Sequence, residues 1–104
     1  MNLIEFKKLL EATGYPVAYS HFKAAVEPPF ITYTTSDTSN LMADNQVYKK
    51  ITDVQVDLYT SIKDPVVEAK LEQLLDQNKI PYEADETWIE SEQLFQRIYY
   101  LGVI

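Results

Sequence analysis

Residues 51–62 read ITDVQVDLYTSI, and their alternation of apolar and polar side chains predicts a strand at the centre of the fold. Val54, Val56 and Leu58 fall on one face of an extended strand, while aspartate and glutamine fall on the other. A strand of this kind buries one face and exposes the other to water, which is typical of antiparallel sheets. The sequence therefore predicts a sheet that is covered on one side.

The first segment of the chain predicts a helix over residues 3–13. Asn2 can cap this helix, and Glu5 occupies the reciprocal position of a capping box. Gly14 suits the left-handed conformation that commonly ends a helix. Apolar residues recur at three-and-four spacing between these limits, so one face of the helix has to pack against another element.

A second helix is predicted over residues 66–77, downstream of the alternating strand. Asp64 is a good N-cap, and Pro65 after it suits the first helical position. Valine and leucine residues give this helix an apolar stripe as well. Both helices are expected on the same face of the sheet.

The remaining segments predict further strands. Residues 30–35 are all aromatic or β-branched, and residues 81–89 and 94–103 have strand composition and are expected to pair as a hairpin. Residues 15–19 have extended character. Together with residues 51–62, these segments predict an α+β fold, in which an antiparallel sheet of at least four strands carries two packed helices in a single domain over residues 1–104.

Composition and charge restrict the classes of function. Of the 104 residues, 46% are hydrophobic and 24% are charged, as in an ordinary globular domain. No apolar run approaches the roughly 18 residues of a membrane span, and the charged N-terminal residues do not resemble a signal peptide. Membrane insertion is therefore not expected. The net charge of −7 opposes binding to a phosphate backbone, so specific nucleic-acid binding is not expected either.

Side chains that could support catalysis or metal binding are scarce. The chain has no cysteine, two glycines and one histidine, His21, which follows Ser20. Adjacent side chains diverge in an extended segment, so Ser20 and His21 do not form a nucleophile and base pair. A zinc site needs cysteines or several histidines, and a phosphate-binding loop needs more glycines. The sequence therefore predicts no catalytic residue, no metal site and no cofactor.

Two features predict an interface with another protein. Residues 36–45 are rich in serine, aspartate and asparagine and are expected to form a long loop, yet they include Leu41 and Met42. These two side chains either fold back as a plug or dock on a partner. The last strand is apolar on both faces, more than a one-sided sheet can bury. The candidate interface residues are Asn40, Leu41, Met42, Asp44, Tyr48, Tyr99 and Leu101.

Several short segments together carry a resemblance to a known family. They are LIEF (3–6), GYPVAY (14–19), PFI (29–31), ADN (43–45), VQVDLY (54–59) and IPYE (80–83). On these segments the chain resembles the tail-completion proteins, of head-tail joining or tail-terminator type, of siphophages and prophages of Gram-positive bacteria. The resemblance extends from Leu3 to about Val103.

The resemblance implies a twisted antiparallel sheet with two helices, and assembly as a homo-oligomeric ring, typically a hexamer, at the end of the tail tube. It implies other phage tail or connector proteins as partners, a location in the host cytoplasm during assembly and then at the head-tail junction of the virion, and no catalytic residues. A ring around a DNA conduit is compatible with an acidic chain, because DNA passes an acidic wall without adhering.

Two alternatives stay open at this point. The chain could be a monomeric adaptor or regulatory domain that binds a phage or host protein through the segment around Leu41 and Met42. It could also be a small hydrolase that uses carboxylates of the acidic segment EADETWIESE, residues 83–92. Self-association distinguishes the ring protein from the adaptor, and a concave pocket with close acidic side chains would favour the hydrolase.

Overall fold

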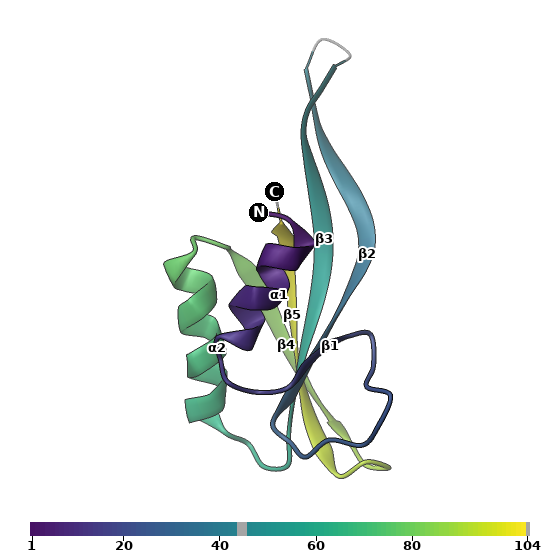
Figure 1. Cartoon of the computed structure of the whole chain (residues 1–104), viewed down its shortest axis with the longest axis vertical. Helices are drawn as coiled ribbons and strands as arrows, with labels where there is room; N and C mark the ends of the chain where they lie inside the picture. The colour runs from purple at the N-terminus through teal and green to yellow at the C-terminus, as the bar shows by residue number, and fades with distance from the viewer. Residues whose placement is uncertain (44–45, 104) are drawn as a thin grey trace.

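The computed structural model describes residues 1–43 and 46–103, with side chains over residues 1–35 and 51–103. Two helices and five strands follow one another along the chain (Figure 1). Their order is α1 (Leu3–Glu11), β1 (Val17–Tyr19), β2 (Phe30–Ala43), β3 (Gln46–Thr60), α2 (Pro65–Gln77), β4 (Tyr82–Ile89) and β5 (Leu94–Val103).

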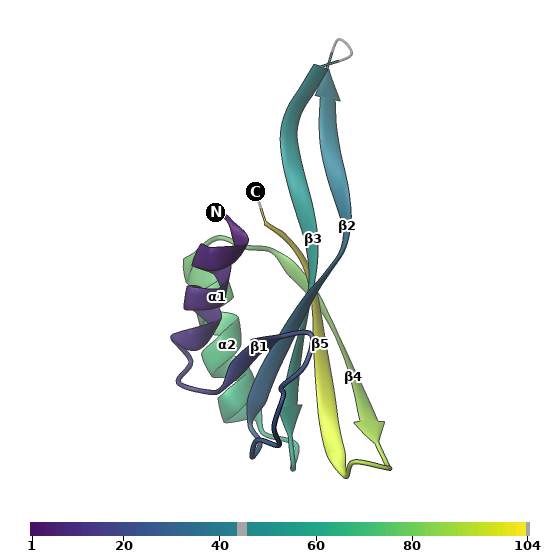
Figure 2. The same ribbon diagram turned by 45° about the vertical axis from the view of Figure 1, so that its right-hand side comes forward.

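The five strands form one sheet in the order β1-β2-β3-β5-β4. The pairs β2–β3, β3–β5 and β4–β5 are antiparallel, whereas β1 pairs with β2 in parallel. Figure 2 shows both helices on one side of the sheet, with the strands crossing at an angle. The predicted α+β class, two helices and at least four strands are confirmed. The sheet is mixed rather than antiparallel throughout, because the predicted extended segment pairs as the short parallel strand β1.

The helix ends follow from the residues that cap them. The side chain of Asn2 accepts a hydrogen bond from the backbone N–H of Glu5 at 2.8 Å, and Glu5 accepts one in return from the backbone of Asn2, which completes a capping box. In α2 the carboxylate of Asp64 accepts from the backbone N–H of Val67 at 3.3 Å, and Pro65 opens the helix. Both predicted N-termini are therefore confirmed to within one residue.

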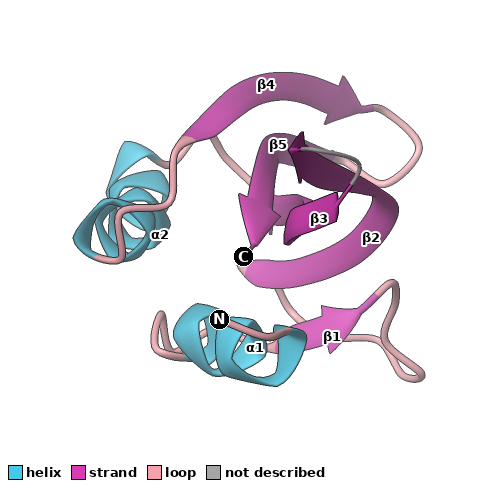
Figure 3. Cartoon of the chain, turned by 90° about the horizontal axis from the view of Figure 1, so that it is seen from above, coloured by secondary structure: helices cyan, strands magenta, loops and turns pink. Residues whose placement is uncertain are grey.

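The hydrophobic core lies between the helices and the sheet. Figure 3, a view from above, shows α1 and α2 beside the curved sheet rather than on opposite faces of it. The core consists of buried residues from both helices, from β2, β3 and β5, and from the turn before β4. They are Phe6, Leu9, Leu10, Ile31, Tyr33, Val54, Val56, Leu58, Val67, Leu71, Leu75, Ile80, Tyr99, Leu101 and Val103. The burial of Val54, Val56 and Leu58 confirms the predicted apolar face of β3, whereas Asp57, on the face predicted to be exposed, is buried as well.

The prediction of a long loop over residues 36–45 is wrong for residues 36–43, the part of this segment that the structure describes. Residues 36–43 continue β2, and β3 already begins at Gln46. Serine, aspartate and asparagine favour turns locally. Here the ladder with β3 satisfies the backbone N–H and C=O groups of these residues, so pairing with a distant segment outweighs the local preference.

Candidate interaction surface

The β2–β3 hairpin is much longer than the sheet that supports it. β1 pairs with β2 only at residues 31–33, and β5 pairs with β3 only at residues 52–60. We call residues 36–43 and 46–50 the arm; beyond the pair of Thr38 with Thr52 it is a two-stranded ribbon that no other strand of the described chain borders. Figure 1 shows this ribbon projecting beyond the helices, and the molecule measures 50 × 26 × 23 Å along its principal axes.

Two irregularities in the ladder shape the arm. One register shift lies between Thr35 and Asp37, where the arm leaves the rest of the molecule, which we call the body. A second lies between Leu41 and Met42. At the second shift Leu41 pairs with Lys49 and Met42 pairs with Val47, so Tyr48 has no register partner. Such β-bulges bend a strand and increase its twist, and they are frequent where a strand takes part in function.

The structure brings four of the predicted interface residues together in the arm. Asn40 pairs with Lys50, and Leu41 and Met42 follow it along β2, with Tyr48 in the facing strand. Asp44, the fifth predicted residue of this segment, lies outside the described residues. The two apolar residues of the former loop prediction therefore belong to a projecting hairpin, away from the core between helices and sheet.

The prediction that Tyr99 and Leu101 face a partner is wrong. Tyr99 has no exposed surface and Leu101 is 7% exposed, because both point toward the helices and are covered by the core. The sequence showed two apolar faces on β5 without showing which face the helices cover. The other face retains the partly exposed pair Ile98 and Tyr100, and Tyr100 is 46% exposed.

A polar cluster fastens α2 to the sheet on the helix side. The Tyr99 hydroxyl donates a hydrogen bond to Glu72 at 2.7 Å, and Arg97 Nε lies 3.3 Å from the same carboxylate. Lys63 Nζ lies 2.8 Å from Glu68 and 2.7 Å from Glu86. Burial raises the pKa of the Tyr99 hydroxyl, and the hydrogen bond to Glu72 adds to the rise. These contacts join one helix to two strands, so we assign the cluster to the fold rather than to a ligand.

The sheet face opposite the helices is acidic around an apolar centre. In one row across the strands, Asp57 of β3 pairs with Ile98 of β5, which pairs with Asp85 of β4. In a neighbouring row, Gln55 pairs with Tyr100, which pairs with Glu83. Asp57 is 6% exposed and accepts hydrogen bonds from the side-chain amides of Gln55 at 3.0 Å and Gln96 at 3.1 Å. An open hollow of about 630 Å³ is lined by Asp53, Val54, Gln55, Pro81, Tyr82, Glu83, Tyr100 and Leu101.

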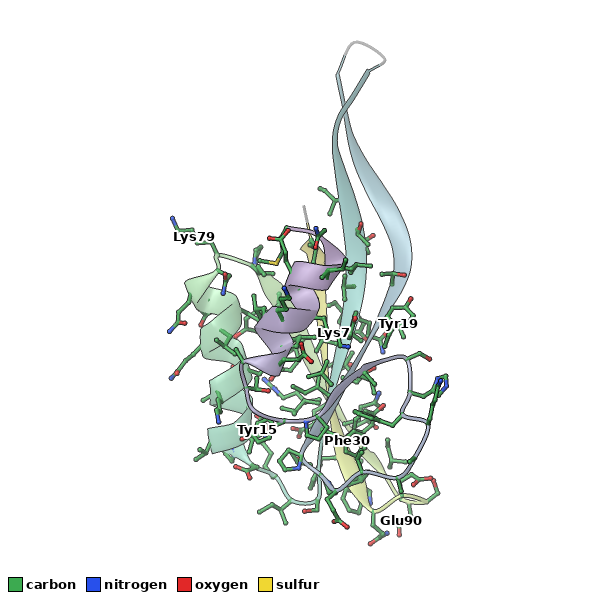
Figure 4. All side chains as sticks on the ribbon, in the orientation of Figure 1. Lys7, Tyr15, Tyr19, Phe30, Lys79 and Glu90 are labelled. Atoms are coloured by element: carbon green, nitrogen blue, oxygen red, sulfur yellow. The ribbon has the colours of Figure 1, made fainter. Side chains whose placement is uncertain are left out.

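Sequence reasoning missed a second hollow at the end of the molecule opposite the arm. Figure 4 places Phe30 and Glu90 at this end. The segment between β1 and β2 folds over the sheet here, where Phe22 packs edge-on against Phe30 at 5.6 Å and Phe30 stacks on Tyr59 at 4.9 Å between ring centroids. The hollow has a volume of about 680 Å³. His21 borders it and lies 3.2 Å from Ser20 through its Nδ1 atom.

Among the described residues no three histidine or acidic side chains gather in a way that could hold a metal ion. No helix in the described part of the chain has the length and apolar character needed to cross a membrane. Neither a protein-family model nor a curated protein sequence matches this chain.

Proposed function

We propose that this chain is a structural protein of phage tail completion or head-tail joining, which assembles as a ring at the end of the tail tube. The observation that carries the proposal is the arm, a projecting two-stranded ribbon that no third strand borders among residues 1–43 and 46–103. An isolated two-stranded hairpin is only marginally stable in water. The arm is therefore suited to a surface that becomes complete when another subunit or the tail tube packs against it.

The charge distribution supports the same proposal. The sheet face opposite the helices presents Asp53, Glu83 and Asp85 at its surface, with Asp57 buried among them, and the whole chain has a net charge of −7. An acidic wall repels the phosphate backbone and lets DNA pass without being retained. A ring of such subunits would present a non-adhesive surface to DNA at the junction of head and tail.

The resemblance of the short segments to tail-completion proteins adds the biological setting. Under this proposal the partners are tail-tube or connector proteins and further copies of the chain, in a ring that is typically six-fold. The protein acts in the host cytoplasm during assembly and then at the head-tail junction. No step of the proposed function requires a catalytic group or a cofactor.

The experiment is electron microscopy of tail tubes or connectors that lack this protein, before and after addition of the purified chain. We expect a terminal ring of added density and conversion to tails that join heads. The matched control is a variant in which residues 40–50 are replaced by Asn-Gly between the register partners Ser39 and Ile51. A stoichiometric one-to-one complex without self-association would contradict the ring and favour the adaptor.

A further inference from the structure

β4 is an edge strand whose outer side no other strand of the described chain covers. It is eight residues long and pairs with β5 along its whole length, and six consecutive residues, from Glu83 to Trp88, are exposed. The backbone N–H of Glu86 already donates to the side chain of Asp85 at 2.8 Å, so the open groups of the edge are those of the other residues. An edge of this length offers a row of backbone groups that can accept an added strand.

The charges of β4 oppose pairing with a second β4. The strand contains Glu83, Asp85 and Glu86 and no basic residue, and because Glu86 is paired with Lys63 at 2.7 Å, the repulsion comes mainly from Glu83 and Asp85. Two copies of this edge would bring like charges together, which destabilises a strand pair. Acidic residues on an edge strand thus protect the molecule against symmetric edge-to-edge association.

The arm carries the opposite charge on its own open edge. β5 ends its pairing with β3 at Thr52, so residues 46–50 of β3 have no strand on that side in the described chain. This stretch includes Lys49 and Lys50 and no acidic residue. Two arm edges would also repel each other, whereas an arm edge and a β4 edge are complementary in charge.

We propose that, in the assembly put forward above, residues 46–50 of one copy add as a strand to the β4 edge of the next copy, with Lys49 and Lys50 opposite the acidic residues of β4. This inference rests on the proposed function and names the surface that the arm occupies. The added strand extends the sheet of one subunit into the next. It also gives the arm a third strand, which the described part of its own chain does not supply.

The two surfaces differ from each other, so the contact is heterologous. Each subunit donates an arm to one neighbour and receives an arm from another, which generates a ring when the rotation between subunits closes. Repulsion between two β4 edges and between two arms disfavours the competing symmetric dimer. The charge pattern therefore selects the ring contact and rejects the alternatives.

The first test is disulfide trapping. Because the natural chain has no cysteine, only the introduced cysteines can form a disulfide. Single variants with cysteine in place of Lys49 or Lys50 are mixed with variants carrying Glu83→Cys or Asp85→Cys, in assemblies on tail tubes and under oxidising conditions. We expect at least one of the four mixtures to form a crosslinked dimer, since a disulfide requires Cα atoms within about 7 Å. Lys8→Cys, on the exposed side of α1, replaces the arm variant in the control and should form none.

The second test is reversal of charge. The variants Lys49→Glu/Lys50→Glu and Glu83→Lys/Asp85→Lys should each assemble about tenfold more weakly than the natural chain, because each places like charges opposite one another. An equal mixture of the two variants should recover assembly, since in a ring where they alternate every arm meets a β4 edge of opposite charge. Circular dichroism checks that both variants are folded.

The outcomes separate this inference from the proposed function. Rings that form normally from both charge variants, or natural rings in which none of the four cysteine pairs crosslinks, overturn the arm-to-β4 contact and leave the proposed function standing. Absence of any ring or self-association by the natural chain, with or without tail tubes, overturns both.

Discussion

Tyr99 shows how much a single residue contributes to the connection between helix and sheet. Its ring is fully buried, and its hydroxyl bonds Glu72 of α2 at 2.7 Å while accepting from Arg97 at 3.0 Å. The residue therefore combines core packing with the polar cluster that holds α2 in place. From the sequence alone, Tyr99 and its neighbour Tyr100 are equivalent; the position of α2 makes one a core residue and the other a surface residue.

This environment predicts an alkaline loss of stability. Burial raises the pKa of Tyr99 above its ordinary value near 10, so above about pH 10 the folded state retains a proton that the unfolded state releases. The contribution of Tyr99 to the free energy of unfolding therefore has its full value below about pH 10 and decreases as the pH rises further. Tyr99→Phe should flatten this fall in urea titrations between pH 9 and 11, at a cost of about 1 kcal/mol at pH 7.

The matched variant for this measurement is Tyr100→Phe, on the opposite face of the same strand and 46% exposed. It should leave the alkaline fall as it is in the natural chain. Equal flattening by both substitutions would mean that the slope comes from tyrosines in general. An unchanged slope in Tyr99→Phe would contradict the assignment to this buried hydroxyl.

The core predicts a large difference in stability cost between buried and exposed residues of α2. Leu71 of α2 is fully buried, whereas Val66 of the same helix is 79% exposed. Leu71→Ala leaves a cavity between helix and sheet and should lower the free energy of unfolding by about 2–5 kcal/mol. Val66→Ala should change it by less than about 0.5 kcal/mol. Denaturant unfolding of both variants checks the pair, and similar values for the two would contradict the described core.

At the scale of elements, the parts predicted well are those with local causes. Both helices begin where Asn2 and Asp64 can cap them, and β3 follows its own alternation. The parts missed depend on distant partners. β1 is three residues long and is defined by its pairing with β2, and the arm exists because residues 36–43 meet residues 46–53 in register. The composition of residues 36–43 indicates the turn preference of serine, aspartate and asparagine, but it does not indicate that these residues pair with β3.

The arm is therefore expected to be separable from the stability of the body. Replacing residues 40–50 by Asn-Gly retains the pair Ser39 and Ile51 and removes no residue of the core. The free energy of unfolding should stay within about 1 kcal/mol of the natural value, because only the ribbon is lost. Thermal and urea unfolding check this. A larger loss, or a molten variant, would show that the arm packs on the body and is not an interaction element.

At the scale of the whole molecule, the candidate surface could be predicted only in part. Leu41 and Met42 in a polar segment pointed to the arm, and the apolar final strand pointed to Tyr99 and Leu101, which are buried. The indication from Leu41 and Met42 was informative because these two residues lie outside the core of the body. The indication from the final strand could not be resolved, because an apolar strand face is covered equally well by a helix of the same chain or by a partner.

The separation of core and arm predicts that Leu41 and Met42 act in assembly and not in folding. The core lies between the helices and the sheet, while Leu41 and Met42 occupy the projecting hairpin, beyond the rows that β1 and β5 border. Burial against a neighbour would contribute roughly 1.5–3 kcal/mol for each of the two side chains. The double variant Leu41→Asp/Met42→Asp should therefore fold with natural stability and fail to complete tails.

Ala43→Asp alone, which adds a charge to the arm without removing a large apolar side chain, is the matched control and should lose less tail-completion activity. If the double variant unfolds the monomer, measured by circular dichroism and urea titration, the two residues support the fold. In that case the assembly contact has to be sought on the β4 edge and the acidic sheet face.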